Sequence, residues 1–364
     1  MYYRNLIIRR ESEWNAYIER ALAYDIYHTW YYHTLNKEGE PLLFVFEEEG
    51  LFIALPLIKR EISGTSFFDL TSVYGYCGPL SNKDLSVLSS LTNQNFKTAF
   101  INFMHEEHCI CIFSRLHPFL NQQYLLENIG GLKENGKTIY MDLTIPLEQQ
   151  KKKYEKRLFR QIKKLRQSGY LIKEADSQKE IKMFTDMYWK NMDRLNASAN
   201  YYYDEQYFTN LLNSTTLQAK LILIYNGPEL ICGAIILLSH DIIRNHLSAT
   251  ASNYLKESPS KLMTDEISMI GRRMGKKIFH LGGGVGGKED NLFKFKSHFS
   301  DLLLNDTLWC YIDNKEVYNA LVTGHVCEQD LHSEFFPLYR KSFNKEIIAN
   351  QNIAFNTNQY IYEK

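Results

Sequence analysis

The hydrophobic and polar positions follow a similar order in the two halves of the chain. Near the N-terminus, a strand-like run over 5–9 precedes a helical pattern over 12–23, and two apolar runs then flank a polar turn at 47–50. In the second half, a helical pattern over 181–191 precedes two apolar runs around a turn at 226–229. The two turns lie close to half the chain length apart, and repeated order at a fixed offset usually marks repeated architecture. The pattern therefore predicts a duplicated α/β unit.

The boundary between the two units is expected near Pro146, where the first pattern ends. A chain of 364 residues is long enough for two or three units of ordinary domain size. We predict an N-terminal domain over 1–145, a C-terminal domain over 146–345 and a tail over 346–364.

A strongly basic segment opens the second unit and is predicted to form one helix over 149–168, ended by Gly169. On a helical wheel, four apolar side chains share one face, namely Tyr154, Leu158, Ile162 and Leu165. Six cations crowd the opposite face: Lys153, Lys156, Arg157, Arg160, Lys163 and Lys164. A solvated outer surface explains this charge, and so does a phosphate-binding face, because like charges at this spacing repel unless an anion joins them. Arg160 and Lys164 are the candidate substrate contacts on that face.

Composition narrows the classes of function. The 42 basic residues balance the 42 acidic ones, so no overall field favours DNA or an anionic membrane, and a polyanion must be bound by a local patch. Six cysteines are scattered over 77–327 in a chain long enough to bury a core without cross-links, which predicts reduced thiols and a reducing compartment. The sequence shows neither a secretory signal nor a bilayer-spanning stretch. We expect a cytoplasmic protein without membrane insertion.

The segment over 276–300 combines a strand, a glycine-rich loop and a helix. Gly282, Gly284 and Gly287 have the spacing of the dinucleotide-binding fingerprint. That motif should open a βαβ unit, whereas this segment comes late and precedes only a short helix, so we reject a Rossmann site. A loop whose backbone approaches a ligand closely is still compatible with the pattern, with Gly283 and Gly284 as candidate substrate contacts.

The helix after this loop separates two lysines. On the wheel, Leu292, Phe295 and Phe299 share the inner side, and Lys296 lies there between Leu292 and Phe293. Lys294 points to the opposite side. An ammonium that faces inward needs a partner or a function, because an unpaired buried charge is costly. An active-site cation and a side chain that reaches back to the surface are both compatible with this position. Asp290 and Asn291 are interpreted as helix-start residues.

Several stretches together resemble one protein family. The sequence LGGGVGGKEDNLFKFKSHF is similar to the segment that closes the second domain in FemAB-type transferases, a branch of the GNAT-like acyltransferase superfamily. Further stretches follow in the order of that family: DIYHT at 25–29, LPLIKR at 55–60, DLTSVYGYCGPL at 69–80, 160–169, and YWKNMDRLNASANYYYDEQYF at 188–208. The resemblance thus spans most of residues 20–300.

The resemblance implies two tandem GNAT-like domains, each a mixed, mostly antiparallel twisted sheet flanked by helices. It also implies transfer of an acyl or aminoacyl group to an amine; in the best-known branch, an aminoacyl-tRNA is the donor and a peptidoglycan precursor the acceptor. By resemblance, Lys296 steadies charge during transfer, Arg160 meets acceptor phosphate, and Tyr76, Gly78 and Pro79 line the acceptor site.

Two departures from the family pattern leave the substrates open. Some relatives carry a basic residue where this chain has Cys77, so the acceptor is undetermined. Relatives that use acetyl-CoA hold its pyrophosphate in a glycine-rich loop, whereas the matching stretch here, ASNYLKESPSK at 251–261, contains no glycine. This disfavours CoA, because backbone amides cradle a pyrophosphate less easily without glycine. The donor is either an aminoacyl-tRNA or an acyl-CoA, and no bound cofactor is expected.

Amide formation also needs a proton acceptor, because only the unprotonated amine attacks a carbonyl. His246, in a predicted central strand, is the candidate catalytic base, and a buried structural histidine is the alternative. Tyr201 and Tyr202 are candidate substrate contacts in a run of three tyrosines. The sequence HEEH at 105–108 resembles a zinc motif but has one residue too few between its histidines, so no metal site is predicted.

Together these features favour a cytoplasmic acyl- or aminoacyltransferase that forms an amide on a cell-envelope precursor, of the peptidoglycan type or a nucleotide-linked sugar. The expected partners are a nucleotide- or lipid-linked precursor and, as a candidate, tRNA. An acyl-CoA-dependent N-acyltransferase of an amino sugar or surface polysaccharide is the first alternative. A non-catalytic protein that binds a glycan or nucleotide is the second.

Overall fold

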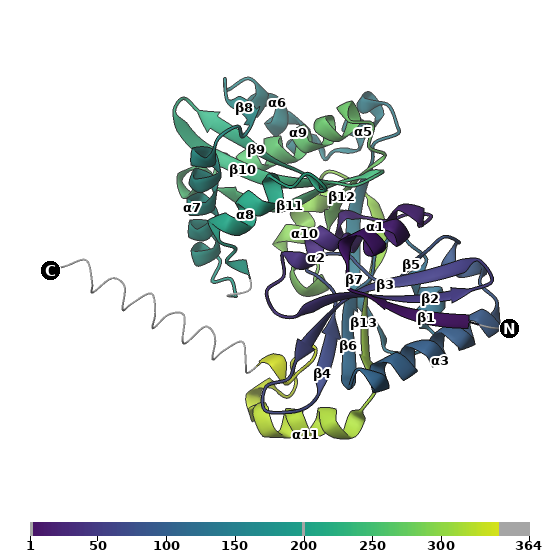
Figure 1. Cartoon of the computed structure of the whole chain (residues 1–364). Helices are drawn as coiled ribbons and strands as arrows, with labels where there is room; N and C mark the ends of the chain where they lie inside the picture. Colours follow the sequence, from purple (N-terminus) through teal and green to yellow (C-terminus); the bar gives the residue numbers. More distant parts are fainter. Residues whose placement is uncertain (1–2, 199–200, 342–364) are drawn as a thin grey trace.

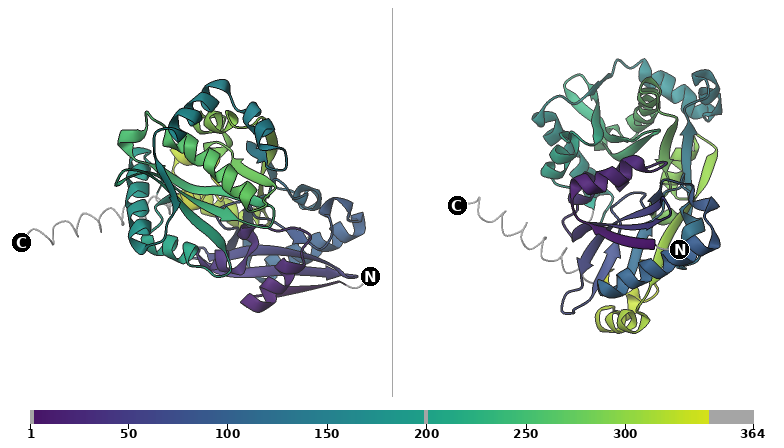
Figure 2. Two further views of the ribbon diagram at one scale, coloured as in Figure 1. Left: turned by 90° about the horizontal axis from the view of Figure 1, so that it is seen from above. Right: turned by 45° about the vertical axis from the view of Figure 1, so that its right-hand side comes forward.

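One 13-stranded sheet runs through the whole molecule. The computed structural model describes residues 3–198 and 201–341. Twelve strands follow one another in the order β1-β2-β3-β4-β6-β13-β7-β12-β11-β10-β9-β8, and the short β5 pairs with β3. In Figure 1, the N-terminal half with β1 to β6 lies below and the C-terminal half with β8 to β12 lies above, and Figure 2 shows the same arrangement from two further sides.

The elements of the N-terminal half match the predicted order of strands and helices. Its strands are β1 (Tyr3–Ile8), β2 (Glu40–Glu48), β3 (Leu51–Glu61), β4 (Phe68–Thr71), β5 (Leu80–Ser81), β6 (Cys109–Arg115) and β7 (Leu132–Asp142). Its helices are α1 (Glu11–Arg20), α2 (Trp30–Thr34), α3 (Ser90–Glu106) and α4 (Gln122–Leu126). The predicted hairpin turn is confirmed at Glu49 and Gly50, which both have positive φ, as a tight hairpin requires.

The C-terminal half repeats this order. Its strands are β8 (Leu171–Glu174), β9 (Gln218–Asn226), β10 (Glu229–Leu238), β11 (Ile242–Thr250), β12 (Ile278–Gly282) and β13 (Leu302–Ile312). Its helices are α5 (Leu147–Lys153), α6 (Lys156–Arg166), α7 (Gln178–Arg194), α8 (Glu205–Leu212), α9 (Pro259–Arg273) and α10 (Asn291–Ser297), and α11 (Lys315–His325) follows β13. Each half contains one parallel pair, β4 with β6 and β11 with β12, within an otherwise antiparallel sheet. The predicted duplication is therefore visible in the topology.

The last strands of the two halves are exchanged. β7, which closes the N-terminal half, pairs with β12 of the C-terminal half, and β13, which closes the C-terminal half, pairs with β6 of the N-terminal half. The two exchanged strands also pair with each other. The halves therefore share one continuous sheet. The predicted domain boundary near residue 145 falls after β7 and stays a prediction.

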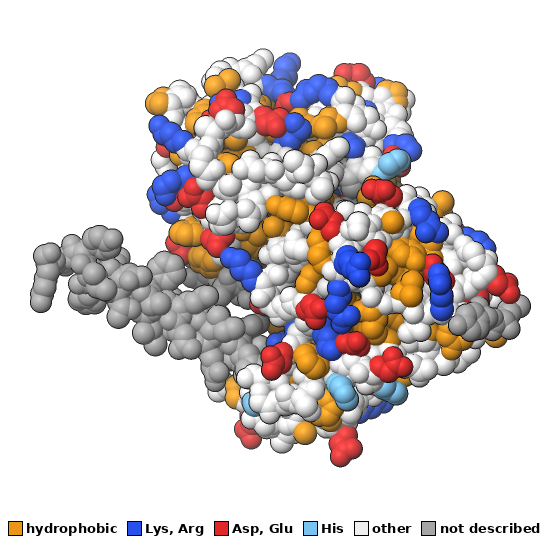
Figure 3. Space-filling model, viewed as in Figure 1, with side chains coloured by type: hydrophobic (Ala, Val, Ile, Leu, Met, Phe, Trp, Pro, Cys, Tyr) orange, Lys and Arg blue, Asp and Glu red, His pale blue; other side chains and the backbone are white. Residues whose placement is uncertain are grey.

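Helices cover both faces of the sheet and bury apolar cores against it. One of these cores joins the halves, because Tyr27 and Tyr76 of the N-terminal half pack with Phe184 of α7 and Phe208 of α8. On the face drawn in Figure 3, Lys and Arg side chains are interspersed with Asp and Glu over both halves, in line with a net charge of zero. Within residues 3–198 and 201–341, none of the helices combines the length and apolar character that crossing a bilayer requires.

Two expectations about helices differ from the structure. The basic segment forms two helices, α5 and α6, because Tyr154 adopts an extended conformation between them and packs edge-on against Phe299. The predicted apolar stripe is nevertheless buried along α6. In α10, the helical wheel placed Leu292 on the inner side, but it is 42% exposed and Phe293 is buried instead. The predicted tail over 346–364 lies outside the described residues.

Candidate active site at the junction of the two halves

Lys296 points inward from α10, as its position on the helical wheel predicted. The helix begins at Asp290, whose carboxylate accepts a hydrogen bond from the Phe293 backbone N–H at 2.9 Å. The buried Phe293 ring fixes the rotation of the helix, so that Lys294 is exposed. On the inner side, Lys296 Nζ donates a hydrogen bond to the Gly283 carbonyl oxygen at 2.5 Å. The helix start at Asp290 is therefore confirmed, and the ammonium is held beside the glycine loop.

The glycine loop is narrow because it packs against backbone. A Cβ at Gly283 would lie 2.7 Å from the Lys137 carbonyl oxygen of β7, and one at Gly287 would overlap the backbone of Asn135. A Cβ at Gly284 would overlap the Lys288 carbonyl within the loop itself. Close backbone contact of this kind requires glycine. The loop is thus built to sit on β7, and a direct substrate contact of Gly283 or Gly284 stays a prediction.

Tyr76 brings the N-terminal half to Lys296. Gly282, at the end of β12, has a φ of 79°, and a Cβ placed on it would lie 3.3 Å from Lys296 Nζ and 3.4 Å from the Tyr76 hydroxyl. Both groups therefore lie beside the same backbone atom. The Tyr76 ring in turn lies 4.2 Å from the guanidinium of Arg115, at the end of β6. We call Lys296, Tyr76, Arg115 and Gly282 the Lys296 site.

Burial controls the charge of Lys296. Desolvation lowers the pKa of the Lys296 ammonium to about 8, and the nearby positive charge of Arg115 acts in the same direction. The Asp290 carboxylate opposes this shift and partly restores the pKa. At neutral pH the side chain is mostly a cation, and it can lose its proton within the physiological range of pH.

Gly78 and Pro79 support the loop that carries Tyr76. Gly78 has a φ of 100°, and the Gln122 side chain fills the space beside it. Gln122 Nε2 donates to the Pro79 carbonyl at 2.8 Å. Cys77, which replaces the basic residue of some relatives, is buried, and its thiol lies 3.4 Å from the Tyr27 carbonyl oxygen. These contacts hold the loop in place, and substrate binding by Gly78 and Pro79 stays a prediction.

His246 lies in an aromatic environment next to the site. Its ring packs edge-on against Tyr32 and Tyr74, and its Nε2 is 3.3 Å from the Tyr207 hydroxyl. Burial, followed by the charge of Arg244, lowers the pKa of His246 to about 3. A neutral imidazole with so low a pKa is a weak proton acceptor, so this geometry gives the predicted catalytic base little support.

The two predicted tyrosines have different surroundings. Tyr201 contacts the ring of Tyr74 edge-on, with 5.9 Å between centroids, and so extends the aromatic wall around His246. The Tyr202 hydroxyl instead donates to the Asp193 carboxylate at 2.8 Å. Tyr201 is thus the better placed of the two for a ligand at the junction, and both contacts with substrate stay predictions.

A buried polar network crosses the junction, and sequence analysis missed it. Arg244 of β11 donates from Nε to the Asp25 carboxylate at 2.8 Å, and His117 Nε2 lies 3.0 Å from the same oxygen. Arg244 also contacts His280 of β12, whose Nε2 lies 2.6 Å from the Thr138 hydroxyl. Burial alone would raise the pKa of Asp25, but Arg244 and His117 outweigh it and hold that pKa well below its usual range. Asp25 opens the DIYHT stretch, but no signal in the sequence linked it to Arg244.

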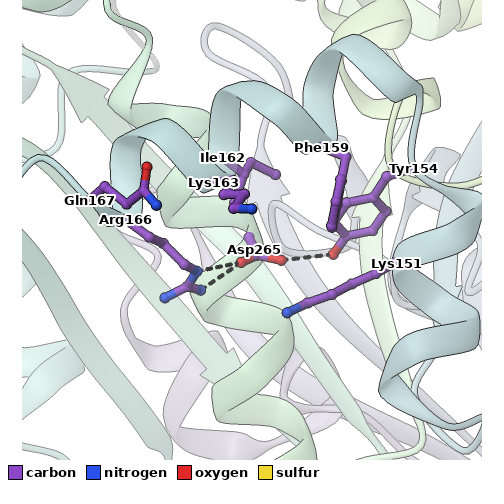
Figure 4. A pocket seen from close by; sticks show the side chains of 8 residues that line it. All are labelled: Lys151, Tyr154, Phe159, Ile162, Lys163, Arg166, Gln167 and Asp265. Carbon is purple, nitrogen blue, oxygen red and sulfur yellow. Dashed lines mark hydrogen bonds and ion pairs between the residues drawn. The ribbon is translucent and has the colours of Figure 1, made fainter.

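Arg160 and Lys164 lie elsewhere, on the exposed side of α6. Among the described residues, Arg160 Nε donates only to the Lys156 carbonyl of its own helix, at 3.3 Å. Beside α6, a cavity of about 280 Å³ opens between α5, α6 and α9, with Lys151 and Lys163 on its rim. Figure 4 shows that Asp265 at its floor is already bonded to Arg166 and Tyr154. No residue of the Lys296 site lines this cavity.

Comparisons with known proteins agree with this architecture. Residues 152–294 match the family model for an acetyltransferase (GNAT) domain. The structure is similar to the crystal structure of FemX, with a TM-score of 0.68 and 13% identity over 87% of this chain and 99% of that one. It is also similar to L-PGS from Bacillus licheniformis (TM-score 0.57, 12% identity, 86% and 95% covered) and to a tandem GNAT protein from the clavulanic acid biosynthesis pathway (0.50, 6%, 86% and 99%). No curated protein matches the sequence.

These similarities settle the fold and the broad class. At such low identities the solved structures show the fold alone, and that fold is a tandem GNAT-like one, as predicted. The sequence match assigns residues 152–294 to an acyltransferase domain of the GNAT type. The resemblance to FemAB-type transferases, inferred from the ordered motifs, is thereby confirmed at the level of the fold.

Proposed function

We propose that this acyltransferase forms an amide on an amino group of a cell-envelope precursor, of the peptidoglycan type or a nucleotide-linked sugar. The observation that carries the proposal is the Lys296 ammonium, held at the junction of the two halves beside Tyr76. When an amine attacks an ester or thioester carbonyl, the new C–N bond places negative charge on the carbonyl oxygen. A fixed cation next to that oxygen stabilises the charge. Collapse of the intermediate then breaks the bond to the donor, and the amine loses its proton.

The proton does not require a base from the enzyme. His246 is neutral and weakly basic in its buried position, with its pKa lowered to about 3. The oxygen or sulfur of the departing donor becomes basic as its bond to carbon breaks, so it can take the proton that the amine releases. Proton transfer within the substrates is therefore the mechanism we favour.

An aminoacyl-tRNA is the donor that we favour. The segment before α9, where relatives that use CoA have a glycine-rich loop, forms a short 3-10 turn at Ser252–Tyr254. Pro259 then begins α9 and removes one of the backbone N–H groups that a helix start can offer to a pyrophosphate. An acyl-CoA donor is the second candidate, and the match of residues 152–294 to an acetyltransferase domain is the observation in its favour.

A transfer assay tests the proposal. The full chain is incubated with aminoacyl-tRNA or acetyl-CoA, each combined with a nucleotide-linked peptidoglycan precursor or a nucleotide-linked amino sugar, and products are analysed by mass spectrometry. We expect one added aminoacyl group on an acceptor amine, linked as an amide that resists mild base. Turnover with acetyl-CoA alone would favour the second candidate, and saturable binding without any transfer would contradict the proposal.

The exposed face of α6 supplies a separate prediction about the polyanionic substrate. If Arg160 and Lys164 contact phosphates, replacing both with glutamine should weaken tRNA or precursor binding and reduce the slope of log affinity against log salt by about one per lost contact. Lys182→Gln, an exposed substitution on α7, serves as the control. Binding is measured by fluorescence anisotropy at several salt concentrations. If log affinity falls with log salt at the same slope in the wild type and the double variant, Arg160 and Lys164 face solvent and make no phosphate contacts.

A further inference from the structure

Two cations lie side by side at the junction, and only Lys296 has a role in the function proposed above. Both cations lie beside Gly283. Its carbonyl accepts the hydrogen bond from Lys296, and a Cβ placed on it would lie 4.0 Å from Arg115 Nη2. The guanidinium also stacks over the Tyr76 ring. Arg115 is therefore part of the site by position, although it comes from the other half of the chain.

Asp306 fixes the orientation of Arg115. Its carboxylate accepts a bidentate pair of hydrogen bonds, from Arg115 Nε at 2.9 Å and from Nη2 at 2.5 Å, and a third bond from Asn135 Nδ2 at 2.7 Å. Asp306 is fully buried. It lies in β13 where the register with β7 shifts, opposite Asn135 and Gly136. Irregularities of this kind re-aim side chains near functional sites, and here one turns a carboxylate toward Arg115.

Three donors at this site have capacity left for a ligand. Arg115 Nε and Nη2 donate hydrogen bonds to Asp306, and Arg115 Nη1 has no acceptor within residues 3–198 and 201–341. The Tyr76 hydroxyl likewise has no hydrogen-bond partner in that part of the chain, and Lys296 uses one of its three N–H groups. Arg115 Nη1 and the Tyr76 hydroxyl have no partner in the described residues, and neither is a fully buried atom, so both are accessible to solvent.

One cation of the Lys296 site has no carboxylate in direct contact. Asp306 pairs with Arg115, whereas Lys296 has no carboxylate within salt-bridge distance in the described residues, and Asp290 acts on it only from farther away. A single positive charge matches the single negative charge of a tetrahedral intermediate. A diphosphate, by contrast, would leave negative charge uncompensated.

We infer that Arg115 is a second catalytic residue of this enzyme: its Nη1, together with Lys296 Nζ and the Tyr76 hydroxyl, binds the negative oxygen that develops on the substrate carbonyl, and Asp306 positions it. The inference rests on the proposed function, because it assumes acyl transfer at Lys296. Donors that are already oriented before the reaction gain most from such charge, since they need no reorganisation when it appears.

A kinetic comparison tests the role of Arg115. Arg115→Gln is expected to lower kcat about 100-fold and to leave KM within about threefold, because the interaction forms only in the transition state. Arg115→Lys should keep more activity than Arg115→Gln. The control is Arg10→Gln, which removes an 83% exposed guanidinium. An unchanged kcat in Arg115→Gln, or a rise in KM alone, would overturn the inference while leaving transfer at Lys296 intact.

A second measurement needs no turnover, because it follows the titration of Lys296. The charged groups facing Lys296 are Arg115 on β6, Asp290 at the start of α10, and Asp306 behind Arg115 on β13. Removing the charge of Arg115 should raise the pKa of Lys296, whereas Asp306→Asn leaves Arg115 uncompensated and should lower it. Lys296 is labelled with acetic anhydride at a series of pH values from about 6 to about 10, and the labelled fraction is measured by mass spectrometry. The midpoint of labelling against pH gives the pKa of Lys296 in each variant.

Opposite shifts of the two midpoints support the inference, because a loss of packing would not produce them. Midpoints that stay in place, or that move in the same direction, overturn it. If Asp306→Asn does not fold, Arg115→Gln alone tests the inference, and its labelling midpoint must then lie at higher pH than that of the wild type. If wild-type protein transfers no acyl group from any donor, the proposed function fails and the catalytic role of Arg115 fails with it, whatever the labelling shows.

Discussion

Lys296→Met is expected to abolish most amide formation and to leave the fold intact. Methionine keeps an unbranched side chain of similar length but removes the charge that Lys296 places beside Gly283. Loss of one preorganised group that stabilises a developing oxyanion typically lowers kcat by about 10²–10³-fold, or roughly 3–4 kcal/mol. Because the neutral side chain no longer has to be desolvated as a cation, the thermal midpoint should stay equal or rise.

The matched control for this variant is Lys294→Met on the same helix. Lys294 has the same chemistry but lies on the exposed side of α10, so transfer should stay at the wild-type rate. Initial rates of amide formation and thermal midpoints are measured for both variants. Full activity in Lys296→Met, or equal losses in the two variants, would refute the role of Lys296.

The pH profile of the wild-type enzyme provides an independent check on the same residue. Lys296 acts as a cation, and burial together with Arg115 lowers its pKa to about 8. Transfer should therefore fall as pH rises above about 8, on the alkaline side of the profile. In Arg115→Gln this alkaline limb should move to higher pH.

The largest effect on stability is expected from Arg244→Met. Arg244 and Asp25 are almost completely buried, and the substitution leaves the Asp25 carboxylate, which still contacts His117, without its guanidinium partner. Breaking a buried ion pair from one side typically costs about 3–5 kcal/mol. The free energy of unfolding, measured from urea denaturation at neutral pH, should fall by that amount.

A double-mutant cycle separates the ion pair from the packing around it. Asp25→Asn alone should also destabilise the protein, whereas Asp25→Asn combined with Arg244→Met should cost less than the sum of the two, because no uncompensated charge is left buried. The exposed pair of Arg10 and Glu13 gives the comparison, and Arg10→Gln should change stability by less than about 1 kcal/mol. Strict additivity in the buried pair would show that Asp25 and Arg244 do not stabilise each other.

Much of the fold was predictable because its signals are local. The hairpin turns, the apolar runs and the helix periods repeat in each half, and each is set by residues a few positions apart. Lys296 was predictable for the same reason, since a helical wheel needs only the residues of one helix. The wheel erred at Leu292, which is exposed because Phe293 packs into the core in its place.

Side-chain contacts between distant parts of the chain could not be predicted from local patterns. Arg115 and Asp306 are separated by 191 positions, and Arg244 and Asp25 by 219. No period in the sequence links positions so far apart. The pairing of Arg115 with Asp306 depends on the exchange of β7 and β13 between the halves, which places β13 beside β6 and turns two repeated units into one sheet.

By itself, then, the order of apolar and polar residues determined that two α/β units occur in tandem and that one lysine of the last short helix faces inward. Only the tertiary structure decided what that lysine faces: a tyrosine and an arginine from the other half, and an aspartate that orients the arginine. The physical reason is that side-chain periodicity is a property of one helix or strand, whereas the electrostatic environment of a buried charge is the sum over all groups that folding brings within a few ångströms. An ammonium of Lys296 that reacted in solution like an ordinary surface lysine would contradict this account of the site.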